Sequence, residues 1–132
     1  MDELASAGME IVATLYVIGE TVGCPGLLEN ASAFHSRDGT LLYGSDYGVE
    51  GIPTGVVVEE LELLAEAGLG RLGALRAATS RPADVLAIDG VGRLAEGSPA
   101  DFAAVRGDPT QDLHALSEPV LVVRGGEIQV GG

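Results

Sequence analysis

The chain has 132 residues and a formal net charge of -13, because twenty Asp and Glu residues face seven Arg and no Lys. Such an acidic surface repels phosphate backbones and anionic lipid, so we expect no nucleic-acid or membrane partner. Hydrophobic residues make up 46% of the chain, which favours a folded core over disorder. The acidic start Met1-Asp2-Glu3 lacks the basic residues of a secretory signal, and we therefore expect a cytoplasmic protein.

The first part of the chain alternates between helical and strand-like patterns. Residues 9–18 are almost continuously apolar and rich in β-branched side chains, which is typical of a strand buried on both faces. In chain order the pattern predicts a helix end over 2–8, a buried strand over 9–18, a Gly- and Pro-punctuated loop over 19–28, a short helix over 29–38 and a second buried strand over 40–44.

Helices and then short strands are predicted for the remainder. After a loop from Ser45 to Gly55, residues 56–67 form an amphipathic helix that is followed by helices over about 70–78 and 80–88. The apolar side of the first helix carries Val57, Leu61 and Leu64, and its polar side carries Glu59, Glu62 and Glu66. Short strands follow at 101–106, 119–124 and 127–130. The pattern indicates an α/β unit with a β-rich appendage, divided near Gly92.

The strongest local signal for chemistry is Gly44-Ser45-Asp46-Tyr47-Gly48. A carboxylate directly after a buried strand lies at the strand end where parallel α/β folds form their active-site rim. Asp46 could therefore bind a metal or take a proton. The alternative is that Asp46 only caps the following loop.

Other candidate motifs are weaker. The GxGxxG match at 68–73 follows a predicted helix, whereas the dinucleotide-binding fingerprint follows a strand. We interpret His35 and His114 as surface residues, since they belong to no motif with metal-ligand spacing. Cys24 is the only cysteine, so an internal disulfide and a Cys-based zinc site are excluded.

Several pieces taken together carry a family resemblance. They are Gly44-Ser45-Asp46, Ile52-Pro53-Thr54-Gly55, EELELLAEAGL (59–69), ALRAATSRPADVLAI (74–88) and VGRLAEGSPADFAAVRGDP (91–109). In this order and spacing the chain resembles the C-terminal part of a metal-dependent amidohydrolase, closest to the imidazolonepropionase and prolidase-like branch. The resemblance implies an α/β fold with the last two strands and helices of a partial (β/α)8 TIM barrel in residues 1–91. Residues 9–16 would be its seventh strand and 40–45 its eighth, and residues 92–132 would form part of a small composite β-sandwich.

The resemblance also implies a reaction. Asp46 matches the family's catalytic Asp, which contacts the metal, orients or deprotonates the bridging water and later passes the proton to the leaving nitrogen. The cofactor would be a divalent metal, zinc in our expectation, and the small-molecule substrate a cyclic amide, an amidine or a small dipeptide. Tyr47 and Glu50 could touch this substrate.

The family's remaining ligands, an HxH pair, a Lys or Glu and two single His residues, have no counterpart in these 132 residues. We therefore expect a segment that is inactive and binds no zinc by itself, and that self-associates or needs the missing N-terminal barrel. Two alternatives remain open: a non-catalytic docking or oligomerisation module, and a barrel that another chain completes.

Overall fold

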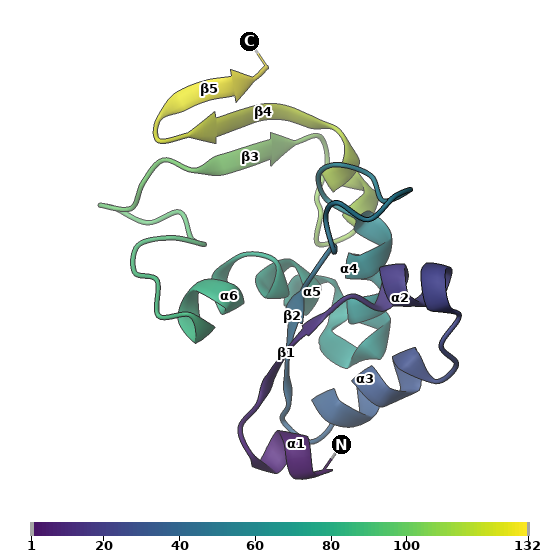
Figure 1. The fold of residues 1–132 in the computed structure, drawn as a ribbon. Coiled ribbons are helices and arrows are strands. Elements are labelled where there is room, and N and C mark those ends of the chain that lie inside the picture. The colour runs from purple at the N-terminus through teal and green to yellow at the C-terminus, as the bar shows by residue number, and fades with distance from the viewer. Residues whose placement is uncertain (1, 132) are drawn as a thin grey trace.

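A computed structural model describes residues 2–131, which fold as a mixed α/β chain (Figure 1). The first half consists of α1 (Asp2–Ser6), β1 (Glu10–Ala13), α2 (Leu15–Val22), α3 (Leu27–His35) and β2 (Thr40–Tyr43). The middle is helical: α4 (Val58–Leu64), the π-helical turn η1 (Ala65–Leu69), α5 (Gly70–Ala77) and α6 (Ser80–Val85). The last part contains β3 (Phe102–Val105), the 3-10 turn η2 (Leu113–Ser117), β4 (Pro119–Arg124) and β5 (Glu127–Val130).

Strands β1 and β2 form a two-stranded parallel sheet, as the two apolar runs predict. Ile11 lies opposite Leu41, and Ala13 lies opposite Tyr43. Helices α2 and α3 make the connection between the strands, because parallel neighbours cannot be joined by a tight hairpin. The carboxyl ends of both strands therefore meet at the same edge of the sheet.

The prediction of one strand over residues 9–18 is wrong in its second half. Strand β1 ends at Ala13, shorter than the 9–16 expected for a barrel strand, and helix α2 begins at Leu15. A continuous apolar run fits a buried helix as well as a buried strand, so its periodicity does not decide between them. The helix also takes up much of the loop expected over 19–28. It ends at Gly23, whose left-handed backbone (φ 62°) closes it.

The core lies between the β1–β2 sheet and the helices. Leu61 and Leu64 of α4 are fully buried, whereas Glu59 and Glu62 are exposed, so the predicted amphipathic helix is confirmed. The cluster of buried side chains consists of Ala13, Ala31, Phe34, Leu41, Val58, Leu61, Leu64, Ala67, Ala74, Ala77 and Leu113. On the other side of the strands, Val12 remains 62% exposed.

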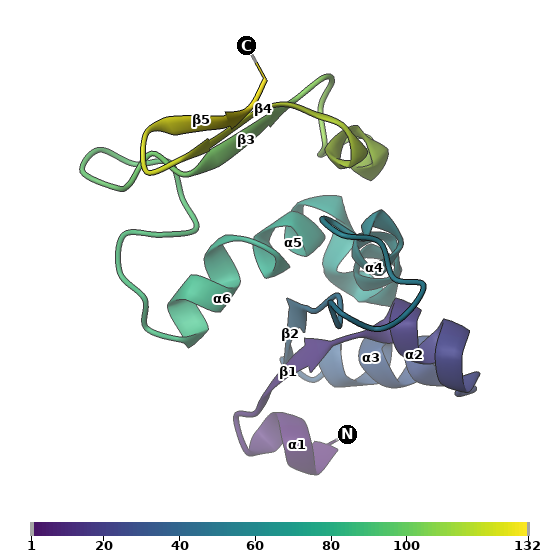
Figure 2. The same ribbon diagram turned by 45° about the horizontal axis from the view of Figure 1, so that its top comes forward.

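The second sheet is antiparallel, in the order β3-β4-β5. Its three strands lie where the sequence predicts them, and Gly125 and Gly126 form the turn between β4 and β5. Figures 1 and 2 show this sheet on one side of the helices, reached through the long segment after α6. Leu113 of η2 belongs to the main core, so η2 fastens the second sheet to α4. None of the helices in residues 2–131 is long and apolar enough to cross a membrane.

Candidate functional site

The candidate site begins where β1 and β2 end side by side. Gly44 follows β2 so closely against β1 that a Cβ atom there would lie 2.7 Å from the Ala13 carbonyl oxygen and 2.7 Å from Val12 Cγ1. Real Cβ atoms do not approach other atoms this closely, so the strand ends need glycine at this position. The chain then leaves the sheet through Ser45 and Asp46.

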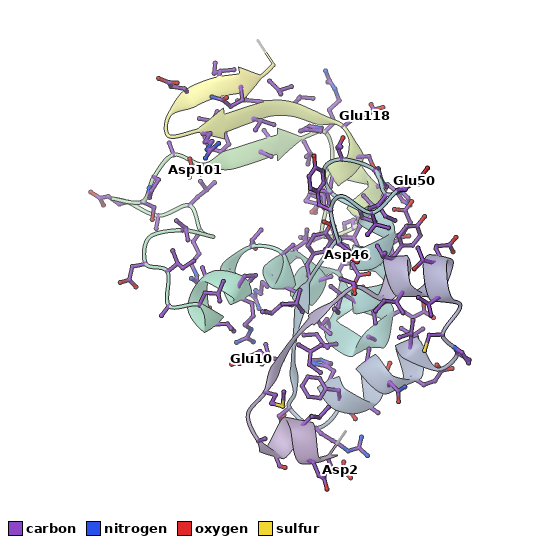
Figure 3. The ribbon with its side chains drawn as sticks, viewed as in Figure 1. Asp2, Glu10, Asp46, Glu50, Asp101 and Glu118 are labelled. Carbon is purple, nitrogen blue, oxygen red and sulfur yellow. The ribbon has the colours of Figure 1, made fainter. Side chains whose placement is uncertain are left out.

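Asp46 lies directly beyond the end of β2, where the sequence analysis expects it (Figure 3). Its backbone is left-handed, with φ 49°, and its carbonyl oxygen accepts a hydrogen bond from the Val49 amide at 3.3 Å. Asp tolerates this conformation better than most residues, and such positions cluster at functional sites. The carboxylate is exposed and accepts no hydrogen bond within residues 2–131. The loop is therefore capped by the Asp46 carbonyl oxygen and not by the side chain.

Tyr47 and Glu50 lie on the loop that continues from Asp46. Tyr47 is 74% exposed, and Glu50 is also exposed and lies farther out along the loop (Figure 3). The loop returns to the core at Val57, whose amide donates a hydrogen bond to the Tyr43 hydroxyl at 2.9 Å. The three predicted site residues thus share one exposed loop, whose two ends are joined by this hydrogen bond.

The residues present do not fit a metal site by themselves. Among residues 2–131, no group of three or more His, Cys, Asp or Glu residues is arranged to hold a metal ion. His35 lies near the other end of β2, with Nδ1 3.4 Å from the Gly39 carbonyl oxygen. His114 Nε2 lies 3.2 Å from Glu62 Oε1. Since a catalytic zinc site normally has about three protein ligands, Asp46 would need partners beyond these residues.

Sequence reasoning missed one group near the strand ends, the carboxyl of Glu60. Glu60 is fully buried, and its Oε2 accepts a hydrogen bond from the Tyr16 amide at 2.7 Å. The N-cap residue of α2, Thr14, makes no side-chain capping bond. Glu60, which belongs to α4, caps the start of α2 instead. Burial raises the pKa of Glu60, and hydrogen bonds from the Tyr16 and Leu15 amides partly offset this rise.

A signal for Glu60 exists in the sequence. Glu60 lies three residues after Val57 and four before Leu64, which places it at the border of the apolar side of the helix. Its second oxygen, Oε1, is buried and has no hydrogen-bond partner in the part of the chain that the structure describes. The group therefore holds the start of α2 at the cost of a partly unsatisfied carboxyl.

Comparison with known proteins identifies the family. Residues 7–129 match the profile described as the Amidohydrolase family. The chain belongs to this family. No curated protein matches it.

Several solved structures share the fold of this chain. A Xaa-Pro dipeptidase with methionine bound in its active site matches with a TM-score of 0.84 at 22% identity, over 98% of this chain and 37% of its own. A Bifidobacterium longum protein assigned as a prolidase gives 0.83 at 27% identity, over 97% of this chain and 39% of its own. An A. niger ochratoxinase gives 0.79 at 24% identity, over 97% of this chain and 33% of its own. The amidohydrolase chain described here thus spans less than two fifths of the length of these structures.

Proposed function

We propose that this chain forms the last two strands and helices of a (β/α)8 barrel in a metal-dependent amidohydrolase. Residues 1–91 would belong to the barrel and 92–132 to a composite β-sandwich. The parallel pairing of β1 and β2 supports this architecture, as does the likeness to prolidase-like structures over nearly the whole chain. The observation that carries the functional proposal is Asp46, exposed directly after β2 in a chain that belongs to this family.

The proposed reaction is hydrolysis of a C–N bond outside an ordinary peptide chain, in a cyclic amide, an amidine or a small dipeptide. The Xaa-Pro dipeptidase and prolidase-like neighbours favour the dipeptide among these substrates. Asp46 would accept a proton from the attacking water and return it to the leaving nitrogen. Tyr47 and Glu50 would contact the substrate from the loop.

The family generally uses a divalent metal, for which we propose zinc, to polarise the attacking water. Asp46 alone does not make such a site, so its other ligands would come from polypeptide outside these 132 residues. We propose the cytoplasm as the location, because the exposed free thiol of Cys24 suits a reducing compartment.

The test uses the longest polypeptide that carries this segment, assayed with zinc and a series of Xaa-Pro dipeptides. Asp46→Asn should lower kcat by a factor of about 10² to 10⁴, the usual contribution of a general acid–base residue, while the melting temperature stays nearly constant. Asp89→Asn is the matched control, because Asp89 is also exposed and lies after α6, away from the strand ends. Equal activities of the two variants would contradict the proposed role of Asp46.

The alternative function is a non-catalytic docking or oligomerisation module. It is favoured by the lack of a metal-binding group within residues 2–131 and by the exposed apolar side chains of Val12, Ile128 and Val130. A polypeptide that carries this segment, hydrolyses no dipeptide and yet assembles through these side chains would establish the alternative.

A further inference from the structure

A cavity of about 370 Å³ lies at the end of β2 that is remote from Asp46. Its walls come from the end of α3, the start of β2 and helices α5 and α6. The polar side chains that line it belong to His35, Asp38, Thr40, Arg76 and Arg81. Asp46, Tyr47 and Glu50 do not contribute to this lining, so the cavity is separate from the candidate catalytic site.

The charge of this cavity is opposite to that of the whole chain. Two of the seven arginines line it, although the net charge is -13. Arg37 and Arg93 form ion pairs with Asp2 and Asp84, whereas Arg76 and Arg81 form none within residues 2–131. Both guanidinium groups are exposed, and the charge of Arg81 also adds to the lowering of the Asp84 pKa that the hydrogen bond from Arg93 mainly causes. An anion in the cavity would be attracted by both arginines.

The part of the cavity wall that α3 and the start of β2 form is held by backbone and ring contacts. The Gly39 amide donates a hydrogen bond to the Phe34 carbonyl oxygen, and a Cβ atom at Gly39 would lie 2.5 Å from the Phe34 ring. The ring of His35 packs against Gly68, where a Cβ atom would lie 3.1 Å from Cδ2. These contacts restrict the movement of this wall, and a site that is ordered before binding loses little entropy on binding.

Asp38 is the one carboxylate in the lining. Its backbone is left-handed, with φ 62°, and its side chain is exposed. It forms no ion pair with Arg76 or Arg81, so both guanidinium groups remain available to bind a ligand. Its own negative charge repels an incoming anion.

We propose that this cavity binds the oxyanion group of a small molecule, a carboxylate or a phosphate, between Arg76 and Arg81. Both groups present the oxygen pairs that the planar guanidinium fork recognises. Asp38 weakens this binding and limits it to ligands of low charge. The site lies outside the reaction proposed for Asp46 and does not depend on it.

The experiment measures binding of inorganic phosphate and of acetate to the longest polypeptide that carries this segment by calorimetry, at matched ionic strength in chloride. The double variant Arg76→Gln/Arg81→Gln should weaken the binding of the preferred anion at least about tenfold, because each lost partner is a charge-assisted hydrogen bond. Arg71→Gln is the control, since Arg71 shares α5 with Arg76 but lines a different surface pocket beside Glu62 and Glu66. It should bind as the wild type does. Tighter binding of phosphate would identify a phosphate-bearing ligand, and tighter binding of acetate a carboxylate.

A second variant keeps the test independent of folding defects. Asp38→Asn should tighten the binding of both anions, because it removes the only negative charge in the lining. Unchanged or weaker binding by this variant would overturn the proposal. So would equal binding by the wild type and the double arginine variant, which would show a general salt effect on the protein surface.

Discussion

The Glu60 carboxyl joins two helices that are far apart in the sequence. It belongs to α4, and the amide that it binds lies 44 residues earlier, at the start of α2. Its pKa is raised because the loss of water around a buried carboxylate outweighs the two amide hydrogen bonds. The native chain therefore holds the Glu60 proton to a higher pH than the unfolded chain does, in which the pKa is near 4.5.

This shift predicts a pH dependence of stability with a definite sign. The contribution of protonated Glu60 is fully present below pH 4.5 and is lost as the pH rises from there through the raised pKa. The wild type should lose this contribution as the pH rises, whereas Glu60→Gln should not. We therefore expect that the free energy of unfolding of Glu60→Gln minus that of the wild type increases from pH 4.5 towards neutrality. Urea unfolding at several pH values measures it. Glu59→Gln, an exposed neighbour, should show no such trend, and parallel curves for wild type and Glu60→Gln would contradict the prediction.

Gly44 gives a second prediction for a single residue. Gly44→Ala would press a methyl group against the Ala13 carbonyl oxygen, and we expect a loss of about 1–3 kcal/mol, the usual range for overpacking. Gly19→Ala is the matched control, because Gly19 is helical and has no atom within 4 Å of the added Cβ. It should stabilise the chain by about 0.5–1 kcal/mol. Chemical denaturation of both variants checks the opposite signs, and a neutral Gly44→Ala would contradict the close approach of the strands.

Among the secondary-structure elements, those with a regular pattern could be predicted and the junction between β1 and α2 could not. The amphipathic spacing of Val57, Leu61 and Leu64 locates α4, and the glycines at 125 and 126 locate the turn between β4 and β5. Within the run over 9–18, the start of α2 is held by a hydrogen bond to Glu60, and no local pattern encodes a partner so distant in the chain. Similarly, the position of Asp46 follows from the buried strand before it, whereas the exposure of Tyr47 and Glu50 depends on the path of the loop. The roles of all three stay predictions.

The short turn η2 connects the second sheet to the core chiefly through Leu113, with Leu116 packed beside it and His114 next to Glu62 of α4. Leu113 is 2% exposed and packs in the main cluster. Leu113→Ala should cost about 2–5 kcal/mol and separate the unfolding of the two sheets into distinct steps. Leu94→Ala, at a position that is 73% exposed, should change stability little. Urea unfolding followed by circular dichroism and by hydrogen exchange of β4 amides tests this, and a single unchanged transition would be the contrary result.

For the whole molecule, the unpaired strand edges predict self-association. Strands β1 and β2 pair only with each other within residues 2–131, and Val12 of β1 is 62% exposed. Open edges beside an apolar surface act as templates for further pairing. The charge of -13 opposes contact, but at physiological salt it acts only over about 8 Å, so short-range burial should dominate.

Sedimentation at moderate salt measures the outcome. We expect oligomers of the 132-residue chain, and we expect Val12→Lys to shift the distribution towards monomer, because a charge on an edge strand blocks pairing. Leu86→Lys is the control, since Leu86 is 64% exposed but lies after α6, outside both sheets. A monodisperse species of 13.4 kDa with a cooperative melt would instead indicate a self-sufficient domain.

The bond between the Tyr43 hydroxyl and the Val57 amide has a consequence for how such a chain can diversify. It joins the two ends of the loop that carries Asp46, so that the loop forms a closed ring between the end of β2 and the N-cap residue of α4. Residues within this ring can be exchanged, inserted or deleted while the register of β2 and the seating of α4 stay as they are, because lengthening a closed loop costs little free energy. Selection for a new ligand can therefore act on the residues between Gly44 and Val57 without repairing the core after each change.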